Sequence, residues 1–186
     1  MKLLSYKATA DMPKGLVDIL IRYRLKGPYS HDELMFEPAD DVAHYVPDGI
    51  LEPIDGKYWC GSSSALDIMP AWSKRRPGKI GGVRWKRIDP KEAKWDILSL
   101  DTFDETLSFD KIAAARWFHD NQGMGYDYRL VGNFISFMIG QEFDKVVCSE
   151  SIATALKFEE AWRYDPVMLF KVLKEMMEVL NKRPIC

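Results

Sequence analysis

The sequence predicts an α+β domain in which helices flank an antiparallel sheet of four to five strands. Two observations favour this class: short segments of alternating polarity gather in the first half, and longer segments of helical periodicity fill the second half. The chain has 186 residues, 47% of them hydrophobic and 12% aromatic, which is enough for one substantial core. No repeat, low-complexity stretch or linker divides it, so we expect a single domain over residues 1–186.

Charge and cysteine content narrow the class of protein. The net charge of -2 predicts no global attraction to nucleic acid or to an anionic membrane. No run approaches the roughly 18 apolar residues of a membrane span, and no signal peptide is evident, so we expect a cytoplasmic protein. Cys60, Cys148 and Cys186 are too irregularly spaced for a disulfide framework or a four-ligand zinc site. We therefore expect reduced thiols, with no metal and no cofactor.

The first segments are a short helix and a strand. Apolar residues recur at helical spacing over residues 14–25, and Gly27-Pro28 ends that helix. Residues 29–37 alternate as a strand does, which places His31 and Glu33 on one face.

Turns and short strands follow. Turn signals at Pro47-Asp48-Gly49 and Asp55-Gly56 predict loops or short strands over residues 42–55. We expect Gly61 through Ser64 to end the strand over residues 57–60. The predicted strands are residues 57–60, 80–88 and 95–100.

The second half predicts helices. Ser108 is the expected N-cap of the first of them, with Asp110 in its first turn. Asp165 and Pro166 supply the N-cap and first position of the last one. That last helix has a single polar stripe, so we expect it to be mostly buried, or to form a homodimer contact. The predicted helices are residues 108–123, 126–139, 149–157 and 166–181.

Cys148 is the main candidate for chemistry. It lies between a short apolar run and a helix, and the partial positive charge of a helix N-terminus favours a nucleophilic thiolate. A free cysteine also commonly just fills space in a core. A thiol nucleophile needs a base, and His31, early in a predicted strand, is better placed for this than His119, which lies near a helix end among polar residues.

Five motifs in order carry a resemblance to a known family. They are Tyr29-Ser30-His31 with an acidic residue two positions on, Cys60-Gly-Ser-Ser-Ser64, Gly81-Gly82-Val83-Arg84, Tyr126-Asp127-Tyr128 and Val147-Cys148-Ser149-Glu150. Over residues 14 to about 158 the chain resembles the circularly permuted branch of the NlpC-type, papain-like cysteine hydrolases, which includes YiiX-like and lecithin retinol acyltransferase-like proteins. In that branch the histidine strand precedes the cysteine helix, and His31 precedes Cys148 here.

The resemblance implies a papain-like fold and a cysteine peptidase, amidase or esterase. The Cys148 thiolate would attack an acyl carbonyl, His31 would act as general base and then acid, and backbone amides near the helix start would form an oxyanion hole. Peptides, amides and lipid esters all fit as substrates.

Three residues are candidates for the third catalytic group, which would orient the imidazole of His31. YiiX-like members carry a glutamate on the strand after the histidine strand, and the matching segment here has no carboxylate, which leaves Ser62 as its nearest polar residue. Glu33 shares the face of His31, but contact along one strand would require bent side chains. His44 is a further option, since acyltransferase-like members use a second histidine.

Three other residues are candidates for the substrate cleft. Glu150, one turn into the cysteine helix, either caps that helix or contacts substrate. Tyr126 and Tyr128 either line the cleft or fill the core.

The basic segment 74–87 supports an alternative: a non-catalytic binding or structural protein of the same fold that uses the segment for an anionic partner. We do not expect a specific nucleic-acid site, because such runs are usually solvated and the remainder of the chain is acidic. The cations from position 74 to 87 are Lys74, Arg75, Arg76, Lys79, Arg84, Lys86 and Arg87, with Trp72 and Trp85 interleaved.

Overall fold

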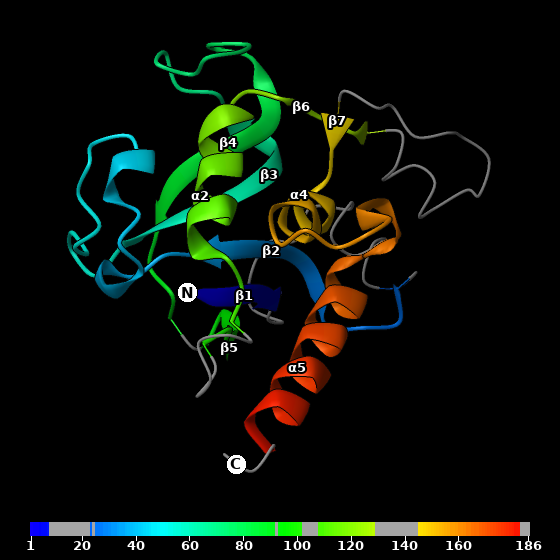
Figure 1. The fold of residues 1–186 in the computed structure, drawn as a ribbon. Coiled ribbons are helices and arrows are strands. Elements are labelled where there is room, and N and C mark those ends of the chain that lie inside the picture. Colours follow the sequence, from blue (N-terminus) through cyan, green and yellow to red (C-terminus); the bar gives the residue numbers. More distant parts are fainter. Residues whose placement is uncertain (8–22, 24, 92, 102–107, 129–144, 183–186) are drawn as a thin grey trace.

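A computed structural model describes residues 1–7, 23, 25–91, 93–101, 108–128 and 145–182 (Figure 1). The strands are β1 Lys2–Lys7, β2 Tyr29–Met35, β3 Tyr58–Ile68, β4 Ile80–Ile88, β5 Trp95–Ser99, β6 Gly125–Tyr126 and β7 Lys145–Val146. The α-helices are α2 Lys111–Asp120, α4 Cys148–Ala155 and α5 Pro166–Lys182, and short 3-10 helices are η1 Pro38–Asp40, η2 Ala43–Tyr45 and η4 Ala161–Arg163.

Five antiparallel strands form the main sheet, in the order β4-β3-β2-β1-β5. This confirms the predicted α+β class and the predicted sheet size, and β2, β4 and β5 match three predicted strands. The sequence analysis missed β1. Leu3, Leu4 and Ser5 are all buried, so this strand lacks the alternation that marks a strand with one solvated face.

β3 runs further than predicted, because small residues that resemble a turn signal lie inside the strand. A side chain at Gly61 would have its Cβ 2.6 Å from the ring of Phe118, so glycine lets α2 approach the sheet. The hydroxyls of Ser62 and Ser63 donate to backbone carbonyls of β2 and β7, at 2.6 and 2.8 Å. The stretch therefore makes close approaches instead of ending the strand.

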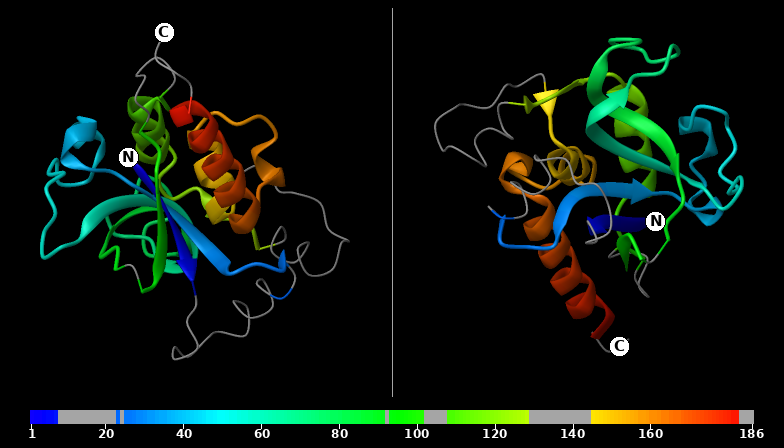
Figure 2. Two further views of the ribbon diagram at one scale, coloured as in Figure 1. Left: turned by 90° about the horizontal axis from the view of Figure 1, so that it is seen from below. Right: turned by 180° about the vertical axis from the view of Figure 1, so that it is seen from behind.

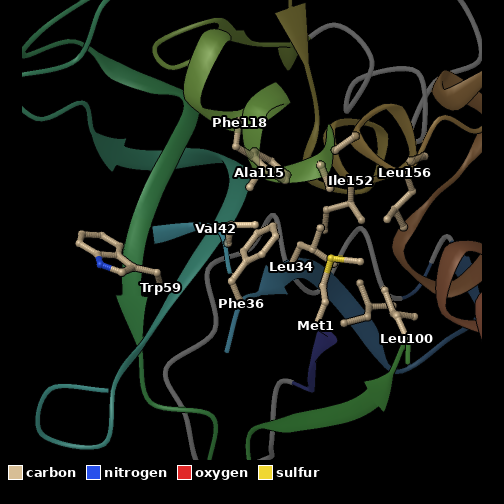
Figure 3. Packing of buried hydrophobic residues seen from close by; sticks show 14 of the residues in the cluster. Met1, Leu34, Phe36, Val42, Trp59, Leu100, Ala115, Phe118, Ile152 and Leu156 are labelled. Atoms are coloured by element: carbon tan, nitrogen blue, oxygen red, sulfur yellow. The ribbon is translucent and has the colours of Figure 1, made fainter. Parts of the chain in front are cut away.

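α2, α4 and α5 share one buried cluster with residues of the sheet, which places the three helices over the same face (Figures 1 and 2). Figure 3 shows this packing from close by, with side chains of α2 and α4 lying against the end of β2. Members from the sheet side include Leu3, Leu34, Phe36 and Val83, and members from the helices include Phe118, Ile152, Leu169 and Leu173.

α2 begins later than predicted. Asp110, and not Ser108, is its N-cap, and its Oδ1 accepts a hydrogen bond of 2.8 Å from the amide of Ala113. An aspartate caps a helix as well as a serine does, and Asp110 immediately precedes the first helical residue.

Two other predicted helices fall largely outside the described residues. Of the helix expected over 14–25, only Tyr23 and Leu25 are described. Of the helix expected over 126–139, Tyr126 instead lies in β6, which pairs in parallel with β7, and residues 129–139 are not described.

α5 has the predicted start, since Oδ1 of Asp165 accepts a 2.8 Å bond from the amide of Met168. The prediction that it is mostly buried is wrong. Among the described elements the helix contacts β1, β2 and α4, and its residues Met168, Met176 and Val179 are exposed. A homodimer through this side remains a prediction. In the described part of the chain, no helix is both long enough and apolar enough to cross a membrane.

The two sides of α5 should differ in their effect on stability. Leu173 is fully buried, so Leu173→Ala should lower the free energy of unfolding by about 2–5 kcal/mol. Val179 is 57% exposed, and Val179→Ala, as the matched control, should stay within about 0.5 kcal/mol. Urea denaturation of both variants checks this, and equal losses would contradict the one-sided packing.

Candidate active site

The site is built from β2 and the start of α4. β2 carries His31 and Glu33, and α4 begins at Cys148 directly after β7 and Val147. Oε2 of Glu150 accepts a bond of 3.3 Å from the amide of Val147. Glu150 is buried and stabilises the start of the helix as a cap, and a contact of Glu150 with substrate remains a prediction.

The imidazole of His31 lies between a thiol and a carboxylate. Its Nε2 is 2.7 Å from Oε1 of Glu33, and Cys148 is near enough to raise the pKa of the ring. Cys148 is 4% exposed, and the side chain of His31 retains 25% exposure. The structure thus brings together three of the predicted catalytic residues.

Glu33 is held in turn by Arg84. The guanidinium binds both carboxylate oxygens, with Nη1 2.7 Å from Oε2 and Nη2 in contact with Oε1. Both side chains are almost fully buried. Nε of Arg84 donates to Oδ2 of Asp67 at 2.7 Å, and Oδ1 of Asp67 accepts from Lys86 at 2.7 Å. The bidentate contact with Arg84 fixes the orientation of the Glu33 carboxylate and favours its ionised form.

These contacts set the protonation states. Burial by itself would raise the pKa of Glu33, but Arg84 and then His31 lower it to about 2. Burial by itself would lower the pKa of His31, but Glu33 and Cys148 outweigh it and raise this pKa to about 10. At neutral pH the site therefore holds an imidazolium between the thiol and an ionised carboxylate.

The other candidates for the third group lie elsewhere. Ser62 is fully buried, and its hydroxyl donates to the carbonyl of Asp32, so it links β3 to β2. His44 is exposed, and its ring lies 3.8 Å from that of Tyr45. Glu33 reaches His31 along the same strand, because the two side chains bend toward each other.

The two tyrosines lie near the site in different environments. Tyr126 is buried against Val147, the residue before Cys148, and its ring is 5.1 Å from that of Tyr128. Tyr128 is 52% exposed, and its hydroxyl donates to the carbonyl of Ala65 at 2.6 Å. A role for either residue in substrate binding remains a prediction.

The roles of Arg84 and Asp67 were not predicted, because Arg84 lies among the cations of the basic segment. The available signal was position: a charged residue in the interior of a predicted strand must find a buried partner. Two further cations of the segment are also neutralised, Lys86 by Asp67 and Arg87 by Asp48 at 3.0 Å. The segment is therefore not one continuous basic surface.

Asp32 lies on β2 between His31 and Glu33. Its Oδ1 accepts a 2.6 Å bond from the hydroxyl of Ser5, and Oδ2 has no partner among the described residues. Burial raises the pKa of this carboxyl to about 7, although the bond from Ser5 lowers it. A half-protonated acid therefore lies in the same strand as the ionised Glu33.

Within the residues that the structure describes, no group of three or more His, Cys, Asp or Glu side chains could hold a metal ion. Comparison of the chain with protein-family models, with curated proteins and with solved structures found no match.

Arg84 should be far more important to stability than a surface cation. Arg84→Met leaves the buried Glu33 carboxylate without its counter-ion, so the free energy of unfolding should fall by about 3–5 kcal/mol. Lys91→Met, which removes an exposed pair with Asp89, should cost at most about 1 kcal/mol. Adding Glu33→Gln to Arg84→Met should recover part of the loss in urea denaturation. If the losses of unfolding free energy in Arg84→Met and Glu33→Gln simply added in the double variant, this would contradict the pairing of Arg84 with Glu33.

Stability should depend on pH through His31. Its folded pKa of about 10 lies above the unfolded value of 6.5, so its contribution is fully present below pH 6.5 and is lost as pH rises through 10. The loss of unfolding free energy in His31→Gln should thus be larger at about pH 6 than at about pH 9.5. His44→Gln controls for removal of an exposed imidazole. A loss that grows with pH would show that the ring is not stabilised as a cation.

Proposed function

We propose that this protein is a cysteine hydrolase that cleaves an amide or an ester through an acyl-enzyme. The observation that carries the proposal is the position of His31 on β2, which packs against α4: the ring is bound by Glu33, and Cys148 at the start of α4 is near enough to raise its pKa. A nucleophile, a base in contact with it and a third group that orients the base are the parts that such chemistry requires.

In this mechanism Cys148 and His31 form a thiolate–imidazolium pair. The sulfur attacks the acyl carbonyl, the C–S bond forms, and the imidazolium gives its proton to the departing amine or alcohol as the scissile bond breaks. The neutral imidazole then takes a proton from water, whose oxygen attacks the thioester and releases the acid and the thiolate. Glu33, fixed by Arg84, keeps the ring in one orientation through both steps.

The negative oxygen of the tetrahedral intermediate needs hydrogen-bond donors. Amides in the first turn of a helix have no acceptor within that helix, and the amide of Cys148 is in this position at the start of α4. The amide of Val147 already donates to Glu150. We assign the backbone amide of Cys148 to the oxyanion site.

The finer fold assignment belongs to the same proposal. A histidine on a strand of an antiparallel sheet, facing a cysteine at the N-terminus of a helix that follows later in the chain, supports the permuted papain-like arrangement. Peptides, other amides and lipid esters remain the substrate classes that we propose. The alternative of a binding protein that uses the basic segment has less support, because Arg84, Lys86 and Arg87 are engaged in ion pairs.

Alkylation at low pH tests the activated thiol. In a Cys186→Ser background, iodoacetamide at about pH 5.5 should label Cys148 and leave the buried Cys60 unmodified, since burial raises the pKa of Cys60. His31→Ala should slow the labelling of Cys148 at least about tenfold, because the counter-ion of the thiolate is lost. Peptide mass mapping identifies the modified residue. Equal labelling rates with and without His31 would contradict the proposed pair.

Turnover tests the mechanism itself. Cys148→Ala and His31→Ala should each abolish hydrolysis of a fluorogenic amide or ester substrate, and the double variant should be no worse than either single one, because the two act as a unit. His119→Ala, on an exposed ring near the end of α2, is the matched control and should keep full activity. Hydrolysis by Cys148→Ala at the wild-type rate would overturn the proposal.

A further inference from the structure

The outer end of the β3–β4 hairpin, residues 66–80, exposes large apolar side chains. We call this segment the β3–β4 tip. Leu66 is 85% exposed, Ile68 67%, Ile80 57% and Trp72 49%. Ile68 and Ile80 are cross-strand partners, so their side chains lie on the same face of the hairpin. Figures 1 and 2 show the loop of the tip projecting beyond the rest of the molecule.

The tip is also cationic. It carries Lys74, Arg75, Arg76 and Lys79, all exposed, and residues 68–88 contain no acid. In the described part of the chain, no carboxylate pairs with Arg75, Arg76 or Lys79, and Lys74 lies 3.7 Å from Asp120. The nearest acid in sequence is Asp67, which is neutralised by Arg84 and Lys86.

Hydrogen bonds hold this segment in shape. The amide of Met69 donates to the carbonyl of Lys79 at 2.8 Å, and the amide of Gly78 donates back to Met69 at 2.9 Å. The hydroxyl of Ser73 donates to the carbonyl of Arg75 at 2.7 Å, and Met69 is buried beneath the loop. The exposed side chains are thus presented by an ordered loop, which reduces the entropy lost on binding.

We propose that the β3–β4 tip docks onto an anionic lipid surface. Exposed aliphatic side chains gain free energy only in an apolar medium, and the headgroup boundary of a bilayer offers that medium next to negative charge. Cations beside the apolar side chains complement anionic lipids at close range. The net charge of -2 does not oppose this, because screening restricts the attraction to charges close to the surface.

The apolar residues decide between a lipid surface and a nucleic acid. A nucleic-acid strand would use Trp72 and the cations, but phosphates and bases give no comparable site for Leu66, Ile68 and Ile80. A lipid surface uses all of these groups together. The inference depends on this surface alone and not on the proposed hydrolase activity.

Vesicle co-sedimentation of the full chain tests the docking. The protein should bind vesicles of phosphatidylcholine with about 30% phosphatidylserine at low salt, should bind pure phosphatidylcholine at least about tenfold more weakly, and should be largely released by about 0.5 M salt. Arg75→Glu/Arg76→Glu/Lys79→Glu should weaken binding at least about tenfold. Leu66→Ser/Ile68→Ser should weaken it several-fold with no change in the charge of the tip.

A matched triple variant controls for the change of charge at sites outside the tip. Lys57→Glu/Lys91→Glu/Lys94→Glu makes the same charge change at exposed sites outside the tip and should bind as wild type does. Absence of binding to anionic vesicles, or equal weakening by the control triple variant, would overturn the proposal. Tighter binding to a single-stranded RNA than to the vesicles, unchanged by Leu66→Ser/Ile68→Ser, would overturn it in favour of a nucleic-acid partner.

Discussion

The buried ion pair between Glu33 and Arg84 is the interaction on which the arrangement of the candidate site depends. It joins β2 to β4 across β3, in a region where β2 and β3 are paired only at Leu34 and Met35. Two charges removed from water cost free energy that only good geometry offsets, and here a bidentate contact and Asp67 complete the set of hydrogen bonds. The gain is specificity: with Glu33 fixed and ionised, the imidazole of His31 has one preferred orientation and is a cation at neutral pH.

Local sequence patterns predicted three strands of the main sheet and the start of the last helix. β2, β4 and the start of α5 were predicted correctly, because alternation and a capping aspartate are local signals. β1 was missed because its sequence, with Leu3 and Leu4 adjacent, does not alternate, and β3 was cut short because glycine and serine serve equally in turns and in close packing. The burial of α5 was overestimated, since an apolar residue in a helix does not require a neighbour to cover it.

The candidate site was predicted in part for the same reason. Cys148 and His31 follow local signals, a helix start and a strand. The choice among Glu33, Ser62 and His44 depended on which side chains meet across the sheet, and strand rise alone argued against Glu33. Arg84, on β4, binds both carboxylate oxygens of Glu33 and so fixes the position of that side chain. The assignment of Arg84 to a basic surface followed from the neighbouring cations, although its position inside a predicted strand favoured a buried partner.

The position of β1 has a consequence for how the protein folds. This strand precedes the other strands of the sheet along the chain, yet it lies inside the sheet, where Lys2 is opposite Met35 on one side and Ser99 on the other. Such non-local pairings raise the contact order and slow folding, and until β5 emerges from the ribosome one edge of β1 is unpaired. Cys148 is translated later still. A nascent chain therefore holds His31 before it holds Cys148, and the two side chains come together only when α4 has folded onto β2.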